Sequence, residues 1–272
     1  MGNSTGFLHP YLVGQATAIA SLDSVRALSQ MPAEKRGGLC PSNDVLVFGG
    51  SQGGHAALWV DRLAPYYARE LSLLGTVATV PPADLLTQAE RALDKMVNAT
   101  GNTIAFLGAS SEWYGVRDRL DEVFLSPYDQ DVPTALENKC NPGGDIDAPD
   151  STDKIFEQSL ITKARNGMLH TVDPWGCMAE YNSLTDTPVG RLGPNKDSYG
   201  ILFVLGSNDD LVHTPIERDS YERLCNAGMP VEFLECKGAG HVDTSLWAMP
   251  EILDFLEARQ MGESFQQPTS CK

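Results

Sequence analysis

Apolar residues follow two different patterns along the chain. Between Leu12 and Leu28 they recur every three or four residues, which predicts a helix with one buried face. Four short segments predict strands, at residues 45–48, 73–80, 201–205 and 231–236. The first of them is a continuous apolar run, as is typical of a strand buried on both faces of a sheet.

Predicted helices alternate with these strands. One covers residues 55–63 and is expected to end near Pro65, and another covers 250–259 with a proline in its first turn. Alternation of buried strands with helices is typical of a mostly parallel sheet that carries helices on both faces. The sequence therefore predicts an α/β fold.

The pattern changes between residues 84 and 197. Helical spacing recurs at 89–97 and 154–164, whereas 126–153 is rich in Pro, Gly, Asp and Asn and has no clear period. An insertion of this length between two core strands predicts a mainly helical cap. We expect residues 1–84, with the nucleophile described below, and 198–272 to form two parts of one core, with 85–197 as the inserted cap.

Charge and cysteine spacing exclude several classes of protein. The formal net charge of −16 argues against nucleic-acid binding, which needs clustered Lys and Arg. No apolar run reaches the roughly 18 residues of a membrane span, and the first residues lack the features of a signal peptide. The six cysteines contain no CxxC pair, so no metal site is expected, although disulfides remain open.

One glycine-rich turn carries a candidate nucleophile. Residues 49–53 read Gly-Gly-Ser-Gln-Gly and match G-x-S-x-G, with a predicted strand before them and a predicted helix after them. This context is typical of the nucleophile elbow, where a tight turn exposes a serine above the sheet. Ser51 is the candidate nucleophile, and the backbone N–H of Gln52 is a candidate oxyanion donor. A purely structural glycine-rich turn is the alternative.

A nucleophilic serine needs a histidine base and a carboxylate that orients it. Asp209 and Asp210 follow the third predicted strand, and His241 follows the fourth in a glycine-rich loop. The order Ser, Asp, His is that of α/β-hydrolases. We prefer Asp209 as the acid and expect Asp210 to face water. We expect His55 to support the elbow.

The predicted cap contains aromatic residues that suit an acyl chain. Phe106, Trp113 and Tyr114 are candidates for substrate binding. Packing of the cap itself explains any one of them equally well, so both interpretations stay open.

Four segments resemble the secretory lipase family of α/β-hydrolases. They are His-Pro-Tyr-Leu at 9–12, Ser-Gln-Gly-Gly-His-Ala-Ala-Leu-Trp at 51–59, Pro-Pro-Ala-Asp-Leu at 81–85 and Gly-Ala-Gly-His at 238–241. The resemblance implies an α/β-hydrolase fold with a helical cap, and Ser51, Asp209 and His241 as nucleophile, acid and base. It also implies hydrolysis of acylglycerols or simpler esters, some disulfides, and a secreted or periplasmic location.

The chain departs from that family at its start. We expect the family's N-terminal portion, with its first strands and a second oxyanion donor, to be lacking here. The strand at 45–48 would then be a sheet edge, and exposed edges invite pairing with another chain. We therefore expect a homodimer or larger assembly through this edge.

Together these features predict a serine carboxylic-ester hydrolase. We expect an esterase or lipase that forms an acyl-enzyme, acts on short- to medium-chain acyl esters and needs no cofactor. One alternative is an impaired oligomeric scaffold or binding remnant of a lipase. The other is an acyl transferase or peptidase that uses the same three residues.

Overall fold

The computed structural model describes residues 8–139, 149–185 and 197–271. The chain divides into two compact units. The first contains residues 1–13, 83–187 and 210–216, and the second contains 14–82, 188–209 and 217–272.

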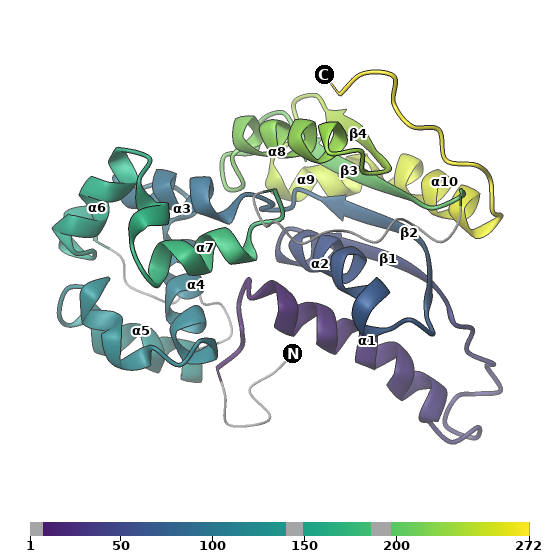
Figure 1. The fold of residues 1–272 in the computed structure, drawn as a ribbon, viewed down its shortest axis with the longest axis horizontal. Coiled ribbons are helices and arrows are strands. Elements are labelled where there is room, and N and C mark those ends of the chain that lie inside the picture. The colour runs from purple at the N-terminus through teal and green to yellow at the C-terminus, as the bar shows by residue number, and fades with distance from the viewer. Residues whose placement is uncertain (1–7, 140–148, 186–196, 272) are drawn as a thin grey trace. The chain divides into compact units, whose positions relative to one another are not determined.

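The second unit is built on a parallel sheet. In the described part of the chain the sheet has four strands in the order β1-β2-β3-β4, and each neighbouring pair is parallel (Figure 1). The predicted α/β fold is confirmed, and every predicted strand is present. The strands are β1 (Asp44–Gly50), β2 (Ser72–Thr79), β3 (Gly200–Gly206) and β4 (Val231–Cys236).

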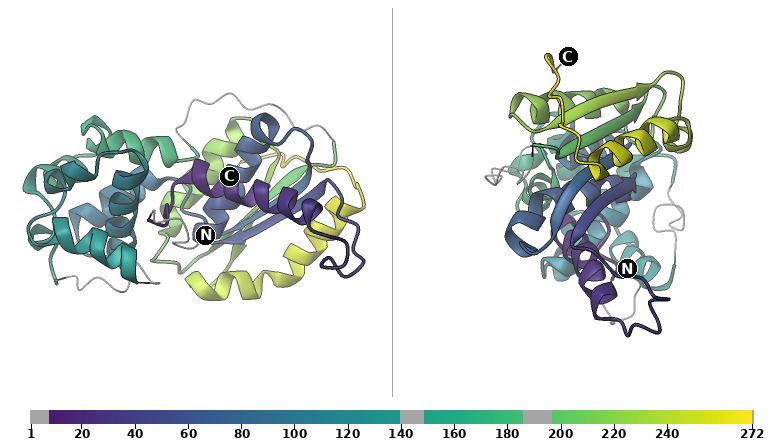
Figure 2. Two further views of the ribbon diagram at one scale, coloured as in Figure 1. Left: turned by 90° about the horizontal axis from the view of Figure 1, so that it is seen from below. Right: turned by 90° about the vertical axis from the view of Figure 1, so that its right-hand side faces the viewer.

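Helices cover both faces of this sheet. Figure 2 shows α2 (Gln52–Tyr67) and α8 (Thr214–Asn226) on one face and α10 (Met249–Gln260) on the other. Tyr221 of α8 stacks on Phe233 with ring centroids 4.6 Å apart. On the opposite face, α10 buries apolar side chains against β2 and β3; this cluster comprises Val77, Leu202, Val204, Ala248, Ile252 and Phe255.

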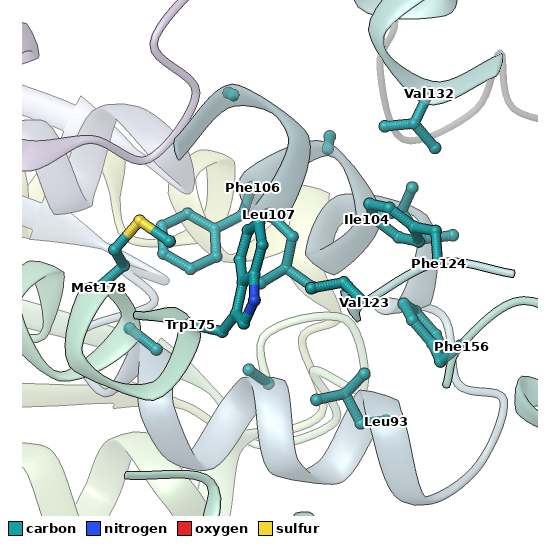
Figure 3. Packing of buried hydrophobic residues seen from close by; sticks show 14 of the residues in the cluster. Leu93, Ile104, Phe106, Leu107, Val123, Phe124, Val132, Phe156, Trp175 and Met178 are labelled. Carbon is teal, nitrogen blue, oxygen red and sulfur yellow. The ribbon is translucent and has the colours of Figure 1, made fainter. Parts of the chain in front are cut away.

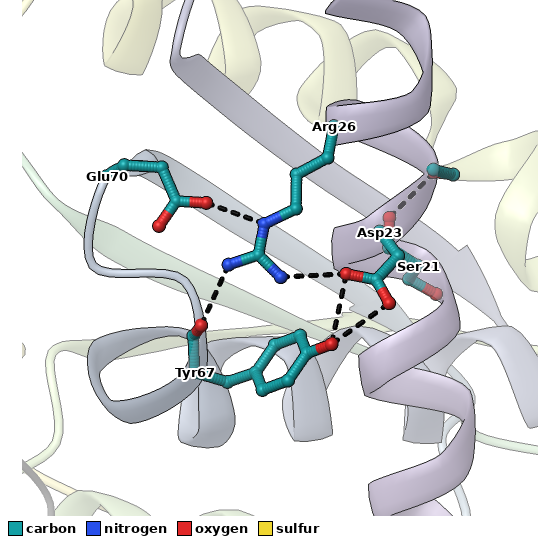
Figure 4. Close-up of polar contacts among 6 residues, drawn as sticks. Ser21, Asp23, Arg26, Tyr67 and Glu70 are labelled. Carbon is teal, nitrogen blue, oxygen red and sulfur yellow. Dashed lines mark hydrogen bonds and ion pairs between the residues drawn. The ribbon is translucent and has the colours of Figure 1, made fainter. Parts of the chain in front are cut away.

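Helix α1 (Gly14–Gln30) packs against α2 and is tied to its end by a polar network. Arg26 donates hydrogen bonds to Asp23, to Glu70 and to the carbonyl of Tyr67, at 2.7, 2.6 and 2.9 Å (Figure 4). The Arg26 guanidinium lowers the pKa of both carboxyl groups. The predicted apolar face is shorter than expected, because Leu28 is 42% exposed.

The first unit is mainly helical and has its own core (Figure 3). Its largest buried side chains include Phe106, Phe124, Phe156 and Trp175. The helices are α3 (Leu85–Asp94), α4 (Thr100–Trp113), α5 (Tyr128–Asn138), α6 (Gln158–Arg165) and α7 (Trp175–Asn182). Short 3-10 turns lie at Arg117–Glu122, Thr152–Lys154 and Leu169–Thr171.

Several helix boundaries differ from the sequence prediction. Helix α2 continues through Pro65 to Tyr67, because a proline this near the end removes only one intrahelical bond and Ala68 N–H still reaches the carbonyl of Ala64. Helix α3 begins earlier than predicted, where the side chain of Asp84 accepts from the N–H of Thr87 at 2.9 Å.

One disulfide joins Cys225, in α8, to Cys271 near the end of the chain. The 46-residue separation encloses β4, α10 and the short helix α9 (His241–Trp247). Closing a loop of this length in the unfolded chain stabilises the fold by about 4 kcal/mol in the chain-entropy picture. Cys40 and Cys177 are exposed thiols, and Cys140 lies outside the described residues.

Across the described ranges, every helix is too short or too polar to cross a lipid bilayer.

Candidate active site

Ser51 occupies a strained turn between β1 and α2. Its φ of 57° and ψ of −121° lie in a region that non-glycine residues rarely adopt. Hydrogen bonds hold the turn on both sides: Ser51 N–H donates to the carbonyl of Thr79 at 2.8 Å, and His55 N–H donates to the carbonyl of Ser51 at 3.0 Å. The sheet and the helix together therefore maintain a conformation that would otherwise relax.

Gly49 explains why small residues surround the serine. A Cβ atom at Gly49 would collide with the carbonyl group of Gly53, in the first turn of α2. The helix backbone thus lies directly against the end of β1. Such close approach requires the first glycine of the G-x-S-x-G pattern, and it aims the N-terminus of α2 at the serine.

The loops after β3 and β4 lie side by side because these strands are neighbours in the sheet. Asn208 N–H donates to the carbonyl of Ala239 at 2.9 Å, and Gly238 N–H donates to the hydroxyl of Ser207 at 2.7 Å. The two loops are therefore linked on both sides. This linkage fixes Asp209 in one loop relative to His241 in the other.

Ser51, His241 and Asp209 form one hydrogen-bonded series within the second unit. His241 Nε2 lies 2.8 Å from Ser51 Oγ, and His241 Nδ1 lies 2.7 Å from Asp209 Oδ2. The Asp209 side chain is buried. An ionised carboxylate only accepts, so Nδ1 carries the imidazole proton, and Nε2 is then able to accept the proton of Ser51.

Asp210 has a different environment from its neighbour. Arg91 donates to its Oδ1 at 2.6 Å and to its carbonyl at 2.9 Å. Asn98 Nδ2 adds a third contact at 3.3 Å. Asp210 is exposed, as expected, but it is also paired with a cation.

The other predicted site residues are one candidate oxyanion donor in α2 and three aromatic residues in the first unit. Gln52 is the first residue of α2, so its backbone N–H belongs to the helix N-terminus. Phe106, Trp113 and Tyr114 all belong to the first unit: Phe106 is buried in its core, and Trp113 is 48% exposed. Tyr114 accepts a hydrogen bond from Asn182 at 3.0 Å, and burial raises its pKa to about 12.

His55 is completely buried in α2, with its ring 6.4 Å from that of Trp59. The supporting role expected of His55 stays a prediction. No group of His, Cys, Asp and Glu side chains within the described segments is arranged to hold a metal ion.

Two hydroxyl groups near the site were missed at the sequence level. The hydroxyls of Thr79 and Ser245 lie 2.6 Å apart, and Thr79 also contacts the backbone of Ser51. Neither residue belongs to a recognisable motif. Their proximity depends on a strand end and a helix that are far apart in sequence.

Solved structures with the same fold include lipases. A Legionella pneumophila protein superposes with a TM-score of 0.78 at 17% identity, over 98% of this chain and 69% of that chain. Candida antarctica lipase A in its closed state superposes with a TM-score of 0.72 at 16% identity, over 96% of this chain and 58% of that chain. These likenesses establish the α/β-hydrolase fold.

Comparison of the amino-acid sequence with known proteins shows to which family the chain belongs. The secreted triacylglycerol lipase LIP2 of Malassezia furfur is 25% identical over 272 residues, which cover 94% of this chain and 53% of that protein. The chain thus spans about half the length of this curated relative. The Secretory lipase family matches residues 4–267, almost the whole sequence. The chain belongs to the secretory lipase family.

Proposed function

We propose that this protein is a serine carboxylic-ester hydrolase, an esterase or lipase. The observation that carries the proposal is the hydrogen-bonded series from Ser51 through His241 to Asp209, at the end of a strained elbow. Membership of the secretory lipase family and similarity to a triacylglycerol lipase support carboxylic esters as the substrate class.

The proposed reaction proceeds through an acyl-enzyme. Ser51 Oγ attacks the ester carbonyl carbon while its proton passes to His241 Nε2, and Asp209 stabilises the imidazolium that forms. The tetrahedral intermediate then expels the alcohol, which takes the proton from His241. Water attacks the acyl-enzyme by the same route, with His241 as base, and releases the carboxylic acid and the serine.

The negative charge on the carbonyl oxygen needs hydrogen-bond donors. We propose the backbone N–H of Gln52 as one of them, since it lies at the N-terminus of α2, where the helix dipole favours an anion. Removing one such donor typically lowers kcat about 100- to 1000-fold. A substrate-binding role for Phe106, Trp113 and Tyr114 stays a prediction, and burial of Phe106 favours packing for that residue.

Hydrolysis of a p-nitrophenyl ester series from acetate to palmitate tests the proposal. Wild-type protein and Ser29→Ala, which changes a serine on exposed α1 surface, should hydrolyse the shorter esters. Ser51→Ala should lose activity by about a millionfold. The profile of rate against chain length separates an esterase from a lipase.

Two outcomes would favour the alternatives. Equal inertness of wild-type and Ser51→Ala protein toward all esters would overturn the proposal and favour a non-catalytic scaffold. Faster cleavage of amides than of matched esters, lost in Ser51→Ala, would instead favour a peptidase on the same residues.

The family and the relative named above also support export from the cell. We propose that the protein works in a secreted or periplasmic setting, where a disulfide such as Cys225–Cys271 persists.

We further propose that the protein associates with a second copy through β1. In the described part of the chain, β1 pairs only with β2 and forms one edge of the sheet. Its residue Phe48 is 47% exposed. An edge strand with exposed apolar side chains is suited to pairing with another strand.

A further inference from the structure

A buried pair of hydroxyl groups lies behind the proposed nucleophile and base. Thr79 is the last residue of β2 and is completely buried. Ser245 lies on α9, one helical turn after His241. Their hydroxyl oxygens are 2.6 Å apart. This short hydrogen bond joins the sheet to α9, the helix whose first residue is His241.

Thr79 also contacts the backbone of the nucleophile. Its carbonyl accepts the N–H of Ser51 at 2.8 Å, one residue beyond the end of the β1–β2 pairing. A single residue therefore binds the serine through its main chain and the histidine helix through its side chain. The hydrogen bond between Ser51 and His241 is a second tie between the elbow and α9.

The surrounding backbone leaves room for this pair and holds it in place. A Cβ atom at Gly50 would lie 3.0 Å from Thr79 Oγ1 and 3.4 Å from Ser245 Oγ, so glycine before the serine gives the two hydroxyls their space. Val80, which follows Thr79, has a φ of 42°, a strained value for a β-branched residue. Its N–H bonds to the carbonyl of Val204 at 2.7 Å, so the sheet enforces this turn.

We propose that Thr79 and Ser245 are a positioning pair that sets the place of the His241 ring relative to Ser51 Oγ. This inference rests on the proposed hydrolase function. The two hydroxyls bond to each other, whereas Ser51, His241 and Asp209 bond among themselves, so the pair acts through the backbone of Ser51 and through α9. Without this bond, α9 loses a direct tie to the end of β2, and the His241 ring can shift relative to Ser51 Oγ even though Asp209 still holds its Nδ1.

Kinetics of four variants test the pair. Thr79→Val, Ser245→Ala and the double variant should each lower kcat on a p-nitrophenyl ester by about 10- to 100-fold with KM unchanged, because the loss is one of geometry. The double variant should be no worse than the single ones, since either change breaks the same bond. Thr79→Ser, which keeps the hydroxyl, should restore kcat.

Thr76→Val is the matched control. Thr76 is also completely buried in β2, three residues before Thr79, and its hydroxyl lies 3.2 Å from that of Tyr199. The Thr76→Val variant should lose about as much stability as Thr79→Val but retain the wild-type kcat. Wild-type kcat in Thr79→Val and Ser245→Ala, or equal losses in Thr76→Val, would overturn the positioning role.

An NMR measurement decides the inference independently of turnover. In protein labelled with 15N-histidine, the Nδ1 proton between His241 and Asp209 should exchange with water faster in Thr79→Val and Ser245→Ala than in wild type and Thr76→Val. Unchanged exchange would contradict the proposal. If wild-type protein hydrolyses no ester, the proposed function fails by itself, and this measurement alone still tests whether the pair holds the histidine.

Discussion

At the scale of single residues, two adjacent aspartates have different partners. Asp209 accepts from His241 Nδ1 at 2.7 Å and is buried, whereas Asp210 is exposed and accepts from Arg91. A carboxylate beside Nδ1 keeps the imidazole in the tautomer that leaves Nε2 able to accept a proton. A carboxylate in an exposed ion pair contributes at most about 1 kcal/mol to stability.

The two aspartates therefore provide a matched comparison. In Asp209→Asn the amide can donate to Nδ1, which shifts the proton to Nε2 and should lower kcat by about 10⁴-fold. Asp210→Asn retains an acceptor for Arg91 and should keep nearly all activity. Esterase assays of both variants check this. If Asp210→Asn were the inactive one, the acid would be wrongly assigned.

Motifs made some site residues predictable from sequence and left others invisible. Ser51 and His241 lie in glycine-rich turns at strand ends, where the chain order itself indicates chemistry. The choice of Asp209 over Asp210 rested on its position in the loop and on the family resemblance. Thr79 and Ser245 are an ordinary strand threonine and an ordinary helix serine, and only the folded sheet brings their hydroxyls within 2.6 Å.

At the scale of elements, the packing of α2 against the sheet depends on Gly54, which lies just outside the G-x-S-x-G motif. A Cβ at Gly54 would lie 2.8 Å from the carbonyl oxygen of Thr79 and 3.1 Å from Cβ of Pro81, whereas a Cβ at Gly53 would meet nothing within 4 Å. Gly53, the second glycine of the motif, thus faces open space, whereas Gly54 lies against the end of β2.

We expect opposite effects from the two alanine variants. Gly54→Ala should destabilise the protein by about 1–3 kcal/mol, because the methyl group pushes α2 away from β2. Gly53→Ala should stabilise it by up to about 1 kcal/mol, since alanine favours the helix. Urea unfolding followed by circular dichroism measures both. Equal urea midpoints for the two variants would show that a methyl group at position 54 is accommodated without moving α2 away from β2.

The strands were easier to predict than the helices of the first unit. Each predicted strand lies within two residues of the observed one, because short apolar runs bounded by Gly, Pro, Asn or Asp are typical of strands. The burial expected for them is found in β3, whereas β1 and β4 are largely half-buried. Helix α4 was missed because ten of its fourteen residues are buried, so it lacks a polar face and the helical period. Helix α5 was missed because its sequence contains Pro133 and lies in a segment rich in turn-forming residues.

At the scale of the whole molecule, two properties act in opposite directions on self-association. The edge strand β1 offers backbone groups and the half-exposed ring of Phe48 to a partner strand. The formal net charge of −16 makes two copies repel each other. Salt screens this repulsion over about 10 Å at 0.1 M, while it leaves the pairing of strands unaffected. Association through β1 should therefore strengthen as salt is added.

Light scattering coupled to size-exclusion chromatography tests this expectation. Wild-type protein should shift from the mass of one chain toward that of two as the salt concentration rises. Phe48→Lys should stay monomeric, since a lysine on an edge strand opposes pairing. Leu253→Lys makes the same kind of change at a 58% exposed position on α10 and should still dimerise, which separates the effect of the edge from that of net charge. A monomer at every salt concentration would rule out association through β1, and dimers of both variants would place the interface elsewhere.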